Sequence, residues 1–124
     1  TRDSGREEFS LATHEAVAFQ TKEIVSSLKD DGVKVDSVRI DGGLTRNAFF
    51  NQILSNVIEL EVLCSKTVES TALGAAYLAG IGAGEVSLQD VSKNWSPKEE
   101  YNPDSNYDLG RYDTWKEFLN RLIS

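Results

Sequence analysis

Two adjacent glycines, Gly42 and Gly43, separate a run of β-branched residues from a stretch with helical spacing. The run Val33 to Ile40 is typical of a strand, and a second apolar segment, Glu61 to Cys64, is also predicted as a strand. Between the glycines and the second strand, helical spacing relates Phe50, Ile53, Leu54 and Val57. Because such units join neighbouring parallel strands by a right-handed crossover, the sequence predicts a strand, loop, helix, strand unit.

A long helix is expected before this unit, from about Arg6 to Lys29. Ser4 and Glu7 have the spacing of a capping box at its start, and Gly32 offers a left-handed stop beyond its end. Six residues at near-helical intervals are expected to form its buried face: Phe9, Ala12, Ala16, Phe19, Ile24 and Leu28.

Four further segments follow the second strand. Residues 71–80 are predicted as a helix, residues 87–91 as a short helix and residues 94–108, with two prolines, as a loop. A last amphipathic helix is expected from about Asp113 to Leu122. The helix at 71–80 has a smooth face, made of Ala72, Ala75, Ala76 and Ala79, and such a helix can lie unusually close to a sheet.

The fold class that these elements indicate is α/β with an incomplete sheet. Only two strands accompany four or five helices, yet both strands have the apolar character of an interior parallel sheet, which is covered on both faces. The 124 residues begin at Thr1 and contain no methionine. We therefore expect residues 1–124 to be one partial domain of a longer protein, with other strands of the sheet supplied elsewhere.

Charge and cysteine content exclude several classes of function. A net charge of −7 repels polyanions, which disfavours nucleic acids and anionic membranes as partners. A single cysteine, Cys64, cannot form an internal disulfide or a multi-cysteine metal site, and its apolar surroundings favour a buried structural thiol. The sequence shows neither the apolar core of a signal peptide nor a stretch able to cross a bilayer. A cytoplasmic location is therefore expected, and the oligomeric state is left open.

The Gly42-Gly43 turn is the most informative candidate site. Glycines let a ligand approach the main chain, and ligands of open α/β sheets collect at the C-terminal ends of strands beside helix N-termini. A phosphate-bearing ligand fits this position, although a ligand-free turn is at least as common for such a pair. Asn47 could direct its amide to the same ligand or only cap the next helix, and Asp41 could bind ligand or only anchor the turn.

Other polar and aromatic side chains are assigned structural roles. His14 is expected to be a packing or surface histidine, because its own helix offers no partner for general-base catalysis. Trp95 and Trp115 are expected to anchor packing. Four acidic residues in the proline-bearing loop lack calcium-loop spacing and are expected to be solvated: Glu99, Glu100, Asp104 and Asp108.

Three segments resemble the FGGY carbohydrate kinase family, and glycerol kinases in particular, over nearly the whole chain. The segments are Glu8 to Thr21, Val38 to Asn47 and Glu69 to Gly80. The strand-Gly-Gly turn is similar to the adenosine motif of the actin, Hsp70 and sugar kinase superfamily, whose members have ribonuclease-H-like domains. Within the first segment, His14 stands where the family has an apolar residue, and Ala16 replaces a common glycine.

This resemblance implies a division of labour. Gly42, Gly43 and Asn47 match the family's nucleotide-contacting positions, so they are expected to hold the adenosine end of ATP. The resemblance also implies Mg²⁺ as a cofactor, glycerol or a related polyol as acceptor, and an N-terminal domain outside this chain. That domain would carry the catalytic aspartate, so residues 1–124 alone are not expected to be catalytic.

Two other functions remain compatible with the sequence. One is a different FGGY kinase, for example one similar to xylulokinase, because acceptor specificity lies outside these residues. The other is a non-catalytic nucleotide-dependent module, since actin and Hsp70 relatives use the same turn to drive conformational change. A ligand-free α/β packing domain is the simplest remaining alternative.

Overall fold

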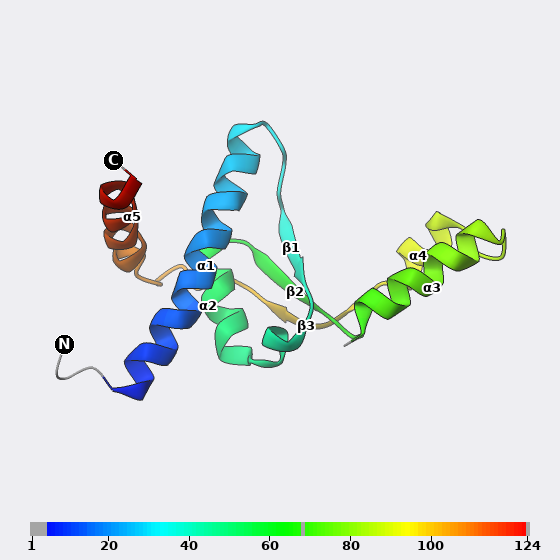
Figure 1. The fold of residues 1–124 in the computed structure, drawn as a ribbon, viewed down its shortest axis with the longest axis horizontal. Coiled ribbons are helices and arrows are strands. Elements are labelled where there is room, and N and C mark those ends of the chain that lie inside the picture. The colour runs from blue at the N-terminus through cyan, green and yellow to red at the C-terminus, as the bar shows by residue number, and fades with distance from the viewer. Residues whose placement is uncertain (1–4, 68, 124) are drawn as a thin grey trace.

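A computed structural model describes residues 5–67 and 69–123, which are arranged around a three-stranded sheet (Figure 1). The strands are β1 (Ser37–Ile40), β2 (Glu61–Ser65) and β3 (Pro97–Tyr101), in the order β1-β2-β3. The helices are α1 (Arg6–Asp30), the 3₁₀ helix η1 (Gly43–Arg46), α2 (Ala48–Ile58), α3 (Ser70–Gly82), α4 (Leu88–Asn94) and α5 (Gly110–Ile123). Each helix expected from the sequence is present, with boundaries shifted by up to three residues.

The predicted parallel pair is confirmed. Ser37 lies opposite Glu61 and Ile40 lies opposite Cys64 in the pairing of β1 with β2. The first strand is shorter than expected, since residues 33–36 do not join the sheet. The chain leaves α1 through Gly32, whose φ of 80° is the expected left-handed stop.

The third strand corrects the expectation that residues 94–108 form only a loop. β3 pairs antiparallel with β2, with Leu63 opposite Glu100. Polar side chains of α2 hold this segment in place, because Ser55 Oγ donates to the carbonyl of Tyr101 at 2.9 Å and Gln52 Nε2 donates to that of Asn102 at 2.8 Å. These partners are distant in sequence, so local spacing does not reveal the strand.

The core lies between α2, β2 and the middle of α1. Its buried apolar members are Ala18, Phe19, Phe50, Ile53, Leu54, Val57, Ile58, Val62 and Tyr112. Along β2, Val62 and Cys64 are buried while the other three residues are half-buried, so only one face of this strand is fully covered within the described residues. Burying this apolar surface gives roughly 1.5–3 kcal/mol for each large side chain.

The buried face expected for α1 is wrong except at Phe19. The buried residues of this helix are Glu15, Ala18, Phe19 and Val25, whereas Phe9 and Ile24 are 70% and 63% exposed. The covered face is therefore rotated around the helix axis from the expected stripe, and the two share only Phe19.

The smooth face of α3 does not pack on the sheet within residues 5–67 and 69–123. No residue of α3 is buried, and its four alanines are exposed. Figure 1 shows α3 and α4 extending away from the sheet, on the side opposite α5.

Candidate functional site

The Gly42 turn is built at the C-terminal end of β1. Gly42 has φ 98° and ψ −179°, a conformation that is essentially restricted to glycine. Its carbonyl accepts hydrogen bonds from the Thr45 amide at 3.2 Å and from Thr45 Oγ1 at 2.7 Å. The buried Asn51 then anchors the far end of the turn by donating from Nδ2 to the Thr45 carbonyl at 2.8 Å. Gly42 is therefore required by the backbone itself.

Gly43 is in a different situation. It begins η1 without a positive φ, and a Cβ atom placed on it meets no heavy atom within 4 Å. Neither the backbone conformation nor packing within the described residues requires glycine here. The turn consequently presents open main chain to solvent, which is the condition for close approach of a ligand.

Asn47 caps α2, as one of its two expected roles requires. Its Oδ1 accepts hydrogen bonds from the amides of Phe49 at 3.1 Å and Phe50 at 3.3 Å. Its Nδ2 lies 3.1 Å from Nε2 of His14. The structure thus brings Gly42, Gly43 and Asn47 together at one turn, with the Asn47 amide nitrogen on the side facing α1.

Asp41 connects this turn to α3. Hydrogen bonding from the Ser70 hydroxyl, and then from the Gly42 and Ser70 amides, lowers the pKa of the Asp41 carboxyl from its ordinary 3.8. Ser70 is the first residue of α3, so the Asp41 carboxyl lies beside the start of that helix. The effect of the Gly42 amide agrees with the other role considered for Asp41, anchoring of the turn through its own backbone.

Two hollows flank the turn. One, of about 530 Å³, lies between the ends of β1 and β2 and helices α3 and α4, and Asp41, Ser65, Tyr77 and Trp95 are among its lining residues. In it the guanidinium of Arg39 lies 3.8 Å from the centre of the Trp95 ring. Trp95 is half-buried and packs on Arg39 at the wall of this hollow, outside the buried core.

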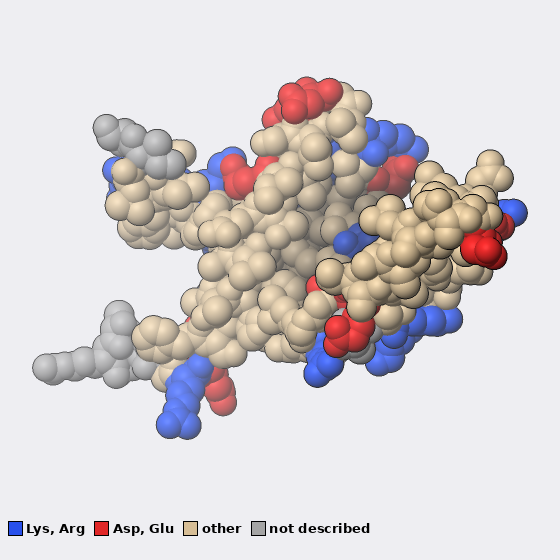
Figure 2. Space-filling view, turned by 45° about the vertical axis from the view of Figure 1, so that its right-hand side comes forward, with Lys and Arg blue, Asp and Glu red and all other residues tan. Residues whose placement is uncertain are grey.

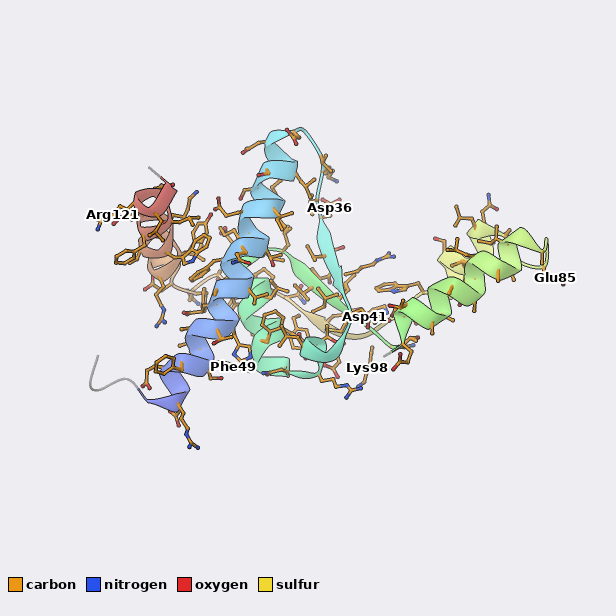
Figure 3. All side chains as sticks on the ribbon, in the orientation of Figure 1. Asp36, Asp41, Phe49, Glu85, Lys98 and Arg121 are labelled. Atoms are coloured by element: carbon orange, nitrogen blue, oxygen red, sulfur yellow. The ribbon has the colours of Figure 1, made fainter. Side chains whose placement is uncertain are left out.

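The second hollow, of about 200 Å³, is polar. Arg46, Lys66 and Lys98 line it together with Asp41 and Glu99. Figure 3 shows Asp41 at the base of α3, above Lys98. This group of cations was not predicted from the sequence, because its members come from η1, the end of β2 and β3, and a positive local charge was not expected in an acidic chain.

The remaining candidates have structural surroundings. Burial raises the pKa of the Cys64 thiol, consistent with the expected inert residue. Trp115 packs 5.7 Å from the Phe19 ring centre, as expected of an anchor. Glu99 accepts a hydrogen bond from the Tyr101 hydroxyl at 2.6 Å. Within residues 5–67 and 69–123, no group of three or more acidic, histidine or cysteine side chains is placed to hold a metal ion, and no helix is long and apolar enough to cross a membrane.

Comparison with known proteins places this geometry in context. The family described as the FGGY family of carbohydrate kinases, C-terminal domain, matches residues 1–83. Glycerol kinase of Haloferax volcanii is 36% identical over 126 residues, covering 99% of this chain and 25% of that protein. Glycerol kinase of Thermoanaerobacter sp. is 34% identical over 127 residues, covering 99% and 26%. The chain therefore spans about a quarter of the length of these relatives.

Solved structures show the same likeness. The crystal structure of Plasmodium falciparum glycerol kinase with ADP aligns with a TM-score of 0.74 at 31% identity, covering 99% of this chain and 25% of that one. Xylulose kinase from Lactobacillus acidophilus aligns with a TM-score of 0.82 at 22% identity, covering 100% and 26%. The second likeness concerns the fold alone.

Proposed function

Since this chain belongs to the FGGY family of carbohydrate kinases, we propose that it is the ATP-binding portion of a glycerol kinase. Residues 1–124 form a partial, C-terminal nucleotide-binding domain in this proposal. The full-length protein, with its N-terminal domain, transfers a phosphoryl group from MgATP to glycerol and yields glycerol 3-phosphate in the cytoplasm. Support comes from two glycerol kinases at 36% and 34% identity and from a third that was solved with ADP.

The fold agrees with this proposal. The α/β arrangement resembles FGGY kinases that have the actin-like ATPase fold, as the sequence predicted. In such sheets ligands bind outside the C-terminal ends of the strands, which is where the Gly42 turn lies.

The observation that carries the nucleotide site is the unexplained glycine at position 43. Gly42 is needed for its φ of 98°, but neither backbone conformation nor packing in the described residues requires glycine at position 43. A nucleotide that lies against the main chain would explain this glycine, because a side chain there would block the contact. We propose that Gly42 and Gly43 present main-chain atoms to the adenosine and its nearest phosphate, and that Asn47 contributes its remaining amide hydrogen.

The role of these residues in the reaction is to bind and orient the nucleotide. Phosphoryl transfer is accelerated mainly by positioning and charge stabilisation, so holding the adenosine end fixes where the γ-phosphoryl group can lie. Mg²⁺ usually binds through substrate phosphates and one or two carboxylates, and neutralises the charge that develops on the phosphates. Asp41 is the carboxylate nearest the turn, but its carboxyl already interacts with Ser70 and with the Gly42 amide. The carboxylate ligands of the metal are therefore expected elsewhere in the full-length protein.

A different acceptor sugar is the second candidate function. Xylulose kinase from Rhodospirillum rubrum aligns with a TM-score of 0.71 at 26% identity, below the identity to the glycerol kinases. The residues of the proposed site bind the nucleotide and do not contact the acceptor sugar in this proposal, so acceptor specificity must be measured directly.

The test is a phosphoryl-transfer assay of the full-length protein against a panel of polyols, pentuloses and hexonates. Glycerol is expected to give the highest kcat/KM with ATP. A pentulose as the best acceptor would replace glycerol in the proposal, and absence of any ATP-dependent transfer or ATP binding would leave a non-catalytic or ligand-free domain.

The same assay tests the nucleotide site through Gly43→Val. A side chain at this position occupies the space where the ligand meets the main chain, so KM for ATP is expected to rise at least about tenfold, or ~1.4 kcal/mol. Gly82→Val is the matched control, because its Cβ position is equally open and lies at the far end of α3. Equal ATP affinity in the two variants would contradict the assignment of Gly43.

A further inference from the structure

His14 connects the first helix to the Asn47 cap across 33 residues of sequence. Its Nδ1 lies 2.7 Å from the carbonyl oxygen of Ser10, one turn earlier in α1. Its Nε2 lies 3.1 Å from Nδ2 of Asn47. The ring also contacts two aromatic rings at the start of α2, with centroid distances of 6.1 Å to Phe49 and 5.7 Å to Phe50.

The two polar partners fix the protonation pattern of this ring. A carbonyl oxygen only accepts hydrogen bonds, so Nδ1 of His14 must carry the proton that is donated to Ser10. An amide nitrogen only donates, so Nε2 must be unprotonated and accept from Asn47. His14 is therefore neutral in this arrangement, as the tautomer with its proton on Nδ1.

The orientation of the Asn47 carboxamide is fixed from both ends. Its oxygen accepts from the Phe49 and Phe50 amides, so rotating the group by 180° would place NH₂ against two backbone donors. Its nitrogen is held by His14. Contacts at both ends define the plane of the amide, and its second N–H hydrogen has no partner among residues 5–67 and 69–123.

We propose that His14 is a positioning residue for nucleotide binding, which holds the Asn47 amide in the plane from which its second hydrogen can meet the nucleotide. This inference rests on the nucleotide site proposed above and adds a residue of α1 to it. An apolar side chain, which the family resemblance leads one to expect at position 14, offers no acceptor for Asn47.

Steady-state kinetics of the full-length protein test the proposal. His14→Leu removes the acceptor and keeps an apolar contact with Phe50, and KM for ATP is expected to rise about three- to tenfold while kcat changes less than about twofold. His14→Gln restores an acceptor and is expected to recover part of the loss. Thr13→Ala is the control, since it removes a hydrogen bond within α1, to the Phe9 carbonyl, without contacting α2.

A double-mutant cycle separates positioning from a general effect on folding. Asn47→Ser keeps a capping oxygen but has no amide, so adding His14→Leu to it is expected to change KM for ATP less than about twofold. The nitrogen shifts of His14, measured by NMR, are expected to report a neutral ring protonated at Nδ1. The proposal is overturned if His14→Leu leaves KM for ATP unchanged, if its effect persists in the Asn47→Ser background, or if the ring carries its proton on Nε2.

These outcomes are distinct from failure of the proposed function. If the wild-type protein uses ATP and Asn47→Ser weakens ATP binding while His14→Leu does not, the nucleotide site stands and only the role of His14 is wrong. If the wild-type protein neither binds nor uses ATP, the nucleotide site and the role of His14 fail together.

Discussion

Asp41 shows how one side chain links the turn to the neighbouring helix. Its side chain is exposed, yet the nearby Ser70 hydroxyl, then the Gly42 amide and the Ser70 amide, lower the pKa of its carboxyl. Hydrogen bonds to the ionised form stabilise that form, which lowers the pKa. The position of Ser70 in the first turn of α3 adds the partial positive charge of a helix N-terminus.

The pH dependence of this link follows from the lowered pKa. Protonating Asp41 removes an acceptor, so its contribution to stability is present above the ordinary value of 3.8 and is lost as the pH falls through the lower value of the folded state. NMR titration of the Asp41 carboxyl is expected to give a pKa below 3.8, and Ser70→Ala is expected to move it upward. An Asp41 pKa that is the same in wild type and Ser70→Ala would show that Ser70 is not its main partner.

Single residues also show what the sequence could and could not predict about the site. A glycine turn at positions 42 and 43 was expected from local rules, and capping was one of the two roles considered for Asn47, but the sequence did not distinguish which glycine the backbone requires. The partner of His14 could not be found in the same way, because Asn47 is remote in sequence and becomes a neighbour only when α1 packs on α2. The cations Arg46, Lys66 and Lys98 converge for the same reason.

At the scale of elements, the predicted helices and the parallel pair were local enough to be recognised, whereas β3 was not. The exposed middle of β3, residues 98–100, lacks the apolar alternation of a strand. Its identity depends on β2 and on the buried polar side chains of α2, such as Ser55. The buried face of α1 was wrong for a related reason: spacing identifies apolar residues but not which of them a partner covers.

The contact between α1 and α5 depends on a buried carboxylate. Glu15 is only 4% exposed, and Arg111 Nη2 lies 2.7 Å from its Oε2. A second acidic residue of α1, Glu23, accepts a hydrogen bond from the Tyr112 hydroxyl. That contact, followed by the effects of Lys116, lowers the pKa of Glu23.

Removing the Glu15 partner tests this contact. Arg111→Ala leaves a buried charge without its main cation, and we expect it to destabilise the fold by about 1–3 kcal/mol. Lys34→Ala is the matched control, because its ion pair with Asp36 is exposed on both sides and should contribute less than about 1 kcal/mol. Urea unfolding of the full-length protein measures both, and equal effects would show that burial of Glu15 adds nothing to the pair.

For the whole molecule, the outstanding feature is the uncharged surface of α3. Its thirteen residues include no Asp, Glu, Lys or Arg, and Figure 2 shows charged side chains near its ends and almost none along its length. Leu78 is 72% exposed, and no residue of the helix is buried. Relatives about four times as long offer enough further chain to cover this surface, which supports the proposal of a larger protein around the described fold.

Leu78→Lys distinguishes a covered α3 from an exposed one. If the rest of the full-length protein packs on this helix, the lysine places a charge in an apolar contact, and thermal unfolding is expected to shift downward by several degrees, for a loss of about 1–3 kcal/mol. Glu85→Lys adds the same side chain beyond the end of the helix, at the exposed tip labelled in Figure 3, and should change stability by less than about 0.5 kcal/mol. If the two variants unfold at the same temperature, Leu78 remains in solvent in the full-length protein. No sheet or domain would then pack against this face of α3.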